Sequence, residues 1–177
     1  MADPQVPIDV DAATGIWTTD GLPMIYMPRH FFVNYYTAMD DALGREKHQA
    51  MLFAASHTSA VQWAAAESKT HGLRDLAVFR HYLNRLSQRG WALFTIEDVA
   101  LGVESVGPSA HVRVDNSVYG LQLGQTGRAE CAMFAGSLAG CLEWAAGDAG
   151  HPTKMTAHET QCIAQGHDHC AFEVRPA

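Results

Sequence analysis

The stretch of sequence that decides the fold lies near the C-terminus and reads HETQCIAQGHDHC, from His158 to Cys170. Its thirteen residues include two cysteines, three histidines and two acidic residues. Gly166 stands between Cys162 and Cys170, where a turn would let two strands fold back on each other. A third cysteine, Cys131, lies at the start of a helical segment upstream. This arrangement indicates a metal site that ties the end of the chain to a helix.

The cysteines favour zinc over disulfide bonds. The N-terminus lacks the basic start and apolar block of a signal peptide, so we expect a cytoplasmic protein, in which a set of four cysteines is more typical of metal binding. Structural zinc sites prefer thiolates in a closed tetrahedron. Three donors would be Cys131, Cys162 and Cys170. Spacing alone leaves the fourth open between Glu159 and a nearby histidine, and the histidine candidates are His158, His167 and His169.

The spacing of Glu159 and Cys162 raises a geometric difficulty. Residues three apart on a regular strand point to opposite faces of the sheet. A shared metal ion therefore requires either a bulge in the strand or a position for Cys162 in the turn that follows.

The amino-acid composition limits the classes of protein to which the chain can belong. The chain has 177 residues, of which 47% are hydrophobic and 18% charged, as in one globular domain. Its formal net charge is −7, and the 12 lysines and arginines form no run, which argues against binding to nucleic acid. No stretch approaches 18 consecutive apolar residues, so no membrane partner is expected.

The first half of the chain predicts helices after a short hairpin. Residues 1–12 resemble an irregular leader, and Asp20-Gly21 is a turn pair between two short strands within 1–27. Pro28 begins a helix that Gly44 ends. Two further helices are expected over 45–70 and 73–89. The apolar residues of the first helix recur at helical spacing: Phe31, Phe32, Tyr35, Met39 and Leu43.

The second half predicts a sheet. Strands are expected over 91–96 and 110–114, with 118–123 as a return strand, and a helix rich in small residues over 129–146. Two last strands, 153–163 and 169–175, enclose the Gly166 turn. The fold class is therefore α+β, with N-terminal helices packed on an antiparallel β-sheet, one further helix, and a C-terminal strand pair that carries the zinc site. Residues 28–177 are expected to form a single domain.

Three parts of the sequence together resemble the 4-vinyl reductase domain. They are VRVDNS at 112–117, Cys131 followed by Gly136 and Gly140, and the pattern E-x-x-C-x7-C-A-F-E-V from Glu159 to Val174. The family includes the sensor domains of phenol-responsive bacterial activators, and its fold is related to heme-nitric-oxide-binding domains and vesicle-tethering subunits. The resemblance implies four zinc ligands, Cys131, Glu159, Cys162 and Cys170.

Four protein ligands leave no open position for water, so the resemblance implies a structural zinc ion. We expect His167, His169 and Lys154 to lie around the ligands and offset their negative charge. Cys141 matches no ligand position and is expected in the core.

The resemblance also implies a pocket for a small aromatic ligand between helices and sheet. This chain departs from the pattern of the phenol sensors, because their hydroxyl-binding histidine falls near Leu86 and their tryptophan on Val114. A more apolar pocket is expected, with Tyr82 and Tyr119 as polar groups. Its candidate lining residues could equally fill the core: Leu86, Trp91, Leu93, Val112, Val114, Tyr119 and Ala157.

The first functional hypothesis is a stand-alone, zinc-stabilised domain that binds a small apolar or aromatic molecule, with a sensor, carrier or accessory role. The alternatives are an enzyme or enzyme component in tetrapyrrole vinyl reduction or another catabolic or biosynthetic pathway, and an assembly subunit. The sequence lacks a glycine-rich nucleotide motif and a nucleophile elbow, so it identifies no catalytic residue. His57, His81 and His111 are isolated histidines and weak candidates for heme ligands. The resemblance implies a homodimer. A stand-alone binding domain would act through a protein partner or by passing on its ligand, so a protein partner is also considered.

Overall fold

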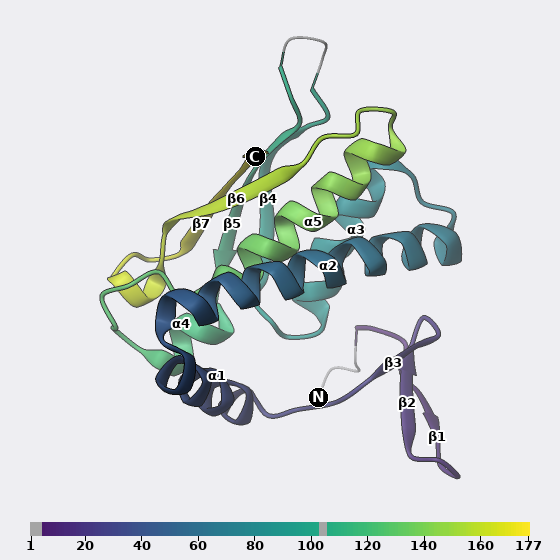
Figure 1. Cartoon of the computed structure of the whole chain (residues 1–177). Coiled ribbons are helices and arrows are strands. Elements are labelled where there is room, and N and C mark those ends of the chain that lie inside the picture. Colours follow the sequence, from purple (N-terminus) through teal and green to yellow (C-terminus); the bar gives the residue numbers. More distant parts are fainter. Residues whose placement is uncertain (1–4, 103–105) are drawn as a thin grey trace.

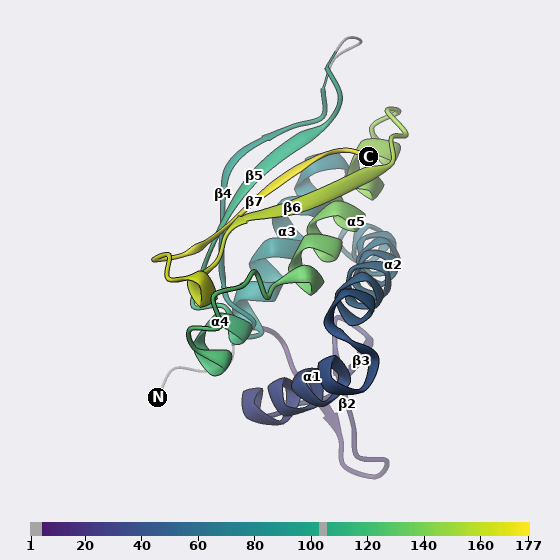
Figure 2. The ribbon, with the colours of Figure 1, turned by 60° about the vertical axis from the view of Figure 1, so that its left-hand side comes forward.

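A four-stranded antiparallel sheet with helices on one face forms the body of the protein. The computed structural model describes residues 5–102 and 106–177. The sheet has the strand order β4-β5-β7-β6, from β4 (Leu93–Ala100), β5 (Ser109–Asp115), β7 (Cys170–Pro176) and β6 (Met155–Gln161). Figure 2 shows the sheet on one side of the molecule, with α3 (Asp75–Gln88) and α5 (Ala132–Asp148) against it and α2 (Arg45–His71) packed on α5.

The close packing of α5 on α2 follows from the small residues of α5. A Cβ atom on Gly136 would collide with the carbonyl oxygen of Phe53, and one on Gly140 with that of His57. The backbones therefore approach too closely for any side chain at these two positions. The other face of α5 covers the sheet with Phe134, Leu138 and Leu142, all fully buried.

The N-terminal part forms a second sheet that lies apart from the first (Figure 1). It consists of β1 (Asp9–Asp11), β2 (Ile16–Thr19) and β3 (Leu22–Met24), and it leads into α1 (Arg29–Leu43). Asp20 and Gly21 both have positive φ, as a type I′ hairpin turn requires. The hairpin prediction is confirmed, but the irregular leader is wrong in part, because residues 9–11 add a third strand.

Most predicted elements are present with small shifts at their ends, and the α+β class with helices on an antiparallel sheet is confirmed. One prediction is wrong: residues 118–123 form the short helix α4 (Val118–Leu123) instead of a return strand. The Ser117 side chain accepts hydrogen bonds from the backbone N–H groups of Tyr119 and Gly120, which starts a helix. Strand β5 is already paired on both edges, by β4 and β7.

The apolar face of α1 also differs from the prediction. Val33 and Tyr36 are its buried residues, whereas Phe31 and Tyr35 are more than half exposed. Among the residues described, no helix is both long and apolar enough to cross a membrane. The cytoplasmic location stays a prediction.

Candidate metal centre

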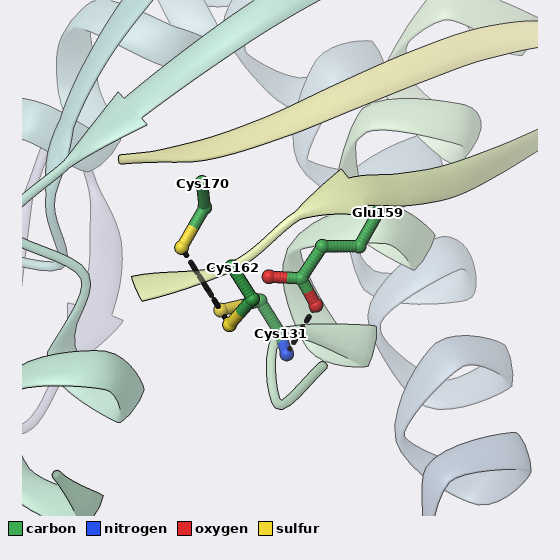
Figure 3. A group of neighbouring side chains, drawn as sticks. All are labelled: Cys131, Glu159, Cys162 and Cys170. Carbon is green, nitrogen blue, oxygen red and sulfur yellow. Dashed lines mark hydrogen bonds between the residues drawn. The ribbon is translucent and has the colours of Figure 1, made fainter. Parts of the chain in front are cut away.

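Four side chains that could hold a metal ion meet where α5, β6 and β7 come together. Cys131 is the residue that caps the N-terminus of α5, Glu159 lies on β6, Cys162 follows β6, and Cys170 begins β7. One ligand atom from each of them lies within 4.8 Å of the others. Figure 3 shows the four side chains pointing toward one another.

A bulge in β6 brings Glu159 and Cys162 to the same place. Glu159 pairs with Phe172 and Gln161 with Ala171, so Thr160 is an extra residue between them. Cys162 then lies at the start of a short 3₁₀-helix, η1 (Ile163–Gln165), before the Gly166 turn. Both solutions to the spacing difficulty are therefore present.

The three thiols are close but not bonded. Sγ of Cys170 lies 3.8 Å from Sγ of Cys131 and 3.8 Å from Sγ of Cys162. A disulfide requires about 2.05 Å between sulfur atoms, and all four cysteines of the chain are free. All three sulfur-bearing residues are fully buried.

Glu159 carries a buried oxygen without a partner among residues 5–102 and 106–177. Its Oε2 accepts a hydrogen bond from the backbone N–H of Cys131 at 2.9 Å, while Oε1 is buried and unpaired. An unpaired buried polar atom costs about 1–3 kcal/mol. A cation bound among the thiols would satisfy that oxygen, so the residues fit a metal ion.

Without a metal ion, the pKa shifts within the cluster oppose deprotonation of all its donors at once. Burial raises the pKa of the Glu159 carboxyl to about 8, and the Cys162 thiolate beside it acts in the same direction. Hydrogen bonds from the Cys131 and Cys170 thiols lower the pKa of Cys162 to about 2. One thiolate is thus shared between two thiols, and the carboxyl beside it is neutral. A divalent cation would reverse this by favouring every deprotonated donor.

Two of the three side chains expected around the cluster pair with other groups, whereas the backbone N–H of His167 donates to the carbonyl oxygen of Cys162. His169 pairs with Asp168, and Lys154 pairs with Glu143 at the other end of β6. Two polar groups that contact the sulfur atoms are Ser117 Oγ, 3.3 Å from Sγ of Cys131, and the backbone N–H of Ile163, which donates to Sγ of Cys170 at 3.4 Å. Ser117 belongs to the VRVDNS motif, so the sequence contained a signal for this role.

A buried polar network that sequence reasoning missed supports Cys131 from the other side. Glu130 is 1% exposed, and its carboxylate accepts from Tyr36 at 2.7 Å and from Thr126 at 2.7 Å. Arg45 forms an ion pair with it at 2.6 Å. Arg45 and Tyr36 lie on different helices, so only the fold brings them to the segment before α5.

The predicted pocket residues lie in three different places. Leu86, Val112, Val114, Tyr119 and Ala157 are buried in the core between helices and sheet. Leu93 is 53% exposed, so the prediction that it lines an enclosed pocket is wrong. It alternates with the buried Phe94 along β4 and therefore points to the outer face of the sheet. Trp91 lines a separate cavity.

That cavity lies between the N-terminal sheet, the start of α1 and the end of α3. Its volume is about 510 Å³. Phe32 and Trp91 meet edge to face in its wall, with 5.2 Å between ring centroids, and Trp17 and Tyr26 stack at 6.3 Å. Polar groups are added to the lining by Arg29, Gln88, Thr18 and Thr19.

Comparison with protein families gives two matches. Residues 2–97 match the family described as "Domain of unknown function (DUF5943)". The chain belongs to this family. Residues 110–176 match the 4-vinyl reductase domain, which confirms the resemblance and contains all four residues of the candidate metal centre. No curated protein matches the chain in sequence.

Solved structures share the fold. The phenol-responsive sensory domain of the transcription activator PoxR, crystallised with phenol, matches with a TM-score of 0.80 at 17% identity, over 96% of this chain and 84% of that one. A vinyl-4-reductase family protein from Methanocaldococcus jannaschii matches with a TM-score of 0.59 at 17% identity, over 87% and 84%. Trafficking protein particle complex subunit 3 from Naegleria fowleri, covalently bound to palmitic acid, matches with a TM-score of 0.54 at 11% identity, over 84% and 95%.

Proposed function

We propose that the protein is a zinc-stabilised domain that binds a small apolar or aromatic molecule and acts as a sensor, carrier or accessory subunit. The observation that carries the proposal is the cavity of about 510 Å³ with an aromatic wall, in a fold shared with a domain that binds phenol. A typical small-molecule site has a volume of about 300–1,000 Å³ and an apolar lining with few polar groups.

Zinc is the metal that the donor set favours. Three thiolates and one carboxylate suit a closed structural zinc site, since thiolates select soft or borderline ions. With zinc–sulfur bonds of about 2.3 Å, the sulfur atoms of a tetrahedron lie about 3.8 Å apart. The two sulfur–sulfur distances of 3.8 Å in the cluster agree with that spacing. The ion would hold β6 and β7 against the N-terminus of α5.

The ligand site is proposed at the aromatic cavity and not among the buried core residues predicted from the sequence. Leu86, Val112, Val114 and Tyr119 are packed against other core side chains, whereas Trp91 and Phe32 line open space. The N-terminal hairpin therefore belongs to the functional unit, because Trp17 and Met24 line the same cavity. Arg29 and Gln88 could bind one polar group of the ligand.

Binding of phenol and of 2-naphthol, followed by tryptophan fluorescence and calorimetry, tests this assignment. Trp91→Ala should weaken binding about 3- to 10-fold, because an aromatic contact contributes about 0.5–1.5 kcal/mol beyond its buried area. Trp144→Ala is the matched control, since Trp144 lines a different depression on the surface. Equal loss of affinity in both variants, or no binding of either probe by the wild type, would contradict the assignment.

We also propose a homodimer. Several large apolar side chains between β3 and α1 and on α1 are exposed, including Ile25 at 80%, Tyr26 at 88% and Phe31 at 59%. Apolar patches of this kind are typical of protein interfaces. Sedimentation of the wild type and of Tyr26→Ser should give a dimer and a monomer respectively. A monomeric wild type would contradict the homodimer, and the exposed apolar side chains would then have to contact another partner.

A further inference from the structure

A second group of metal-binding side chains lies at the junction of α2 and α3, away from the cysteines. Nε2 of His81 is 2.8 Å from Oε2 of Glu67, and Nε2 of His71 is 3.2 Å from the same oxygen. One ligand atom of each residue lies within 4.8 Å of the others. The two imidazole rings are 4.9 Å apart between centroids.

Local structure explains why these three side chains meet. Glu67 and His71 are four residues apart on α2, so they lie on the same face, one turn from each other. Gly72 then adopts a left-handed conformation and ends the helix. The chain returns as α3 after a short connection, and His81 on α3 comes back beside Glu67.

An unpaired oxygen of the buried Glu67 carboxylate is a second observation that points to a bound ion. Its side chain is 0% exposed, and Oε1 has no hydrogen-bond partner in the described parts of the chain. Burial of a carboxylate is costly unless both oxygens are paired or bound to a cation. The two histidine nitrogens contact only Oε2. A metal ion bound by these nitrogens would replace those contacts and would also give the unpaired Oε1 a partner.

The hairpin turn of the N-terminal sheet places one more carboxylate beside this group of three. Asp20 is 6% exposed, and its Oδ1 lies 3.7 Å from Nε2 of His71. Its other oxygen, Oδ2, forms an ion pair with Arg85 at 2.9 Å. Asp20 is the first of the two central residues of the turn, with φ 53°, and its carboxylate reaches side chains of both α2 and α3.

We propose that Glu67, His71 and His81 bind a divalent transition-metal ion, with Asp20 as a fourth donor. Imidazole nitrogens with carboxylate oxygens suit zinc, nickel, copper or iron, whereas thiolates are absent from this group. The positive charges of Arg85 and Arg89 nearby oppose a cation. The site is therefore weaker than the cysteine site and exchanges its metal more readily.

The ion would clamp the β2–β3 hairpin to the helical body. Asp20 comes from the hairpin, Glu67 and His71 from α2, and His81 from α3, so three separate elements share one ion. Thr18 and Thr19, which precede Asp20, line the aromatic cavity. The proposed metal site can be tested independently of the function of that cavity, because the order of the hairpin can be measured without a ligand in the cavity.

Cobalt(II) titration of the purified full chain distinguishes the two sites. Cobalt at the cysteines gives sulfur-to-metal charge-transfer absorption, whereas cobalt at the histidine group gives weaker d–d bands only. The wild type should bind a second equivalent of cobalt without added charge transfer. His81→Ala and Glu67→Gln should each lower the affinity for the second cobalt ion about tenfold or more.

His57→Ala is the matched control. Nε2 of His57, also on α2, lies 3.2 Å from Oε2 of Glu143 on α5, a similar histidine–glutamate pair but without a second histidine. This variant should bind the second cobalt ion as the wild type does. His71→Ala serves as an additional test if His81→Ala fails to fold, because His71 is the most exposed of the three, at 30%.

Hydrogen exchange provides the second measurement. Cobalt or zinc beyond the first equivalent should slow exchange in residues 16–24 of the wild type and of His57→Ala, but not of His71→Ala or Asp20→Asn. A second equivalent bound equally well by His71→Ala and Glu67→Gln would overturn the proposal. So would a wild type that binds only the metal that gives charge transfer. In either case the cysteine site and the aromatic cavity would be unaffected.

Discussion

Replacement of Cys170 by serine tests the central role of the cysteine cluster. Sγ of Cys170 lies 3.8 Å from both other thiols, so it is the sulfur that links the set. A serine hydroxyl is a poor zinc ligand, and the remaining donors would be two thiolates and Glu159. We expect the variant to lose the metal ion.

The size of the effect follows from the coupling of metal binding to folding. Binding of structural zinc contributes about 10–16 kcal/mol in small domains at neutral pH. The free energy of unfolding of a whole domain is about 5–15 kcal/mol. Loss of the ion also leaves Glu159 Oε1 buried and unpaired, at a cost of about 1–3 kcal/mol. The variant should therefore be unfolded or barely folded at ordinary temperature.

The assay combines cobalt charge-transfer absorption with urea unfolding followed by circular dichroism. Cys141→Ser is the matched control, because Cys141 is also fully buried but lies outside the cluster. It should lose only about 1–3 kcal/mol, the cost of a buried hydroxyl without a partner, and keep its charge-transfer band. The reasoning is refuted if Cys170→Ser unfolds at the same urea concentration as Cys141→Ser, or if the metal-free wild type is fully stable.

Three further predictions concern pH, packing and the buried network. Burial raises the pKa of Glu159 to about 8, so the small stability that remains without metal is full below the ordinary pKa of a carboxyl and is lost as pH rises through the folded-state value. The folded fraction of metal-free protein, measured by circular dichroism without denaturant, should fall as pH rises across that range, and Glu159→Gln should remove this dependence. With zinc bound, the trend should be opposite, because acid protonates the ligands. Gly140→Ala should destabilise the protein by about 1–3 kcal/mol, because the added Cβ atom collides with the backbone of α2. Gly147→Ala on the same helix is the control: its Cβ atom meets no atom within 4 Å, so it should stabilise the protein by up to about 1 kcal/mol. Equal thermal midpoints of the two variants would contradict the packing argument. Tyr36→Phe should cost about 1.5–3 kcal/mol, since it removes a hydrogen bond to the buried Glu130 carboxylate, while Tyr35→Phe, at an exposed neighbour, should leave the unfolding free energy unchanged.

Local patterns in the sequence were sufficient for most elements. Gly44 and Gly72 ended the helices where predicted, and Asp20-Gly21 formed the hairpin turn. Residues 118–123 were misassigned because Ser117 starts a helix with hydrogen bonds that propensity does not reveal. The tertiary pairing of β5 with β4 and β7 then left no edge for another strand.

The sequence by itself determined the members of the cysteine cluster. The donor types and the resemblance identified Cys131, Glu159, Cys162 and Cys170, because metal chemistry restricts which residues can serve. Only the tertiary structure decided that Ser117 lies beside Cys131 and that the Glu130 network comes from distant helices. It also formed a cavity beside the N-terminal sheet and brought Glu67, His71 and His81 together. Contacts between elements far apart in the sequence depend on packing, and no local spacing encodes them.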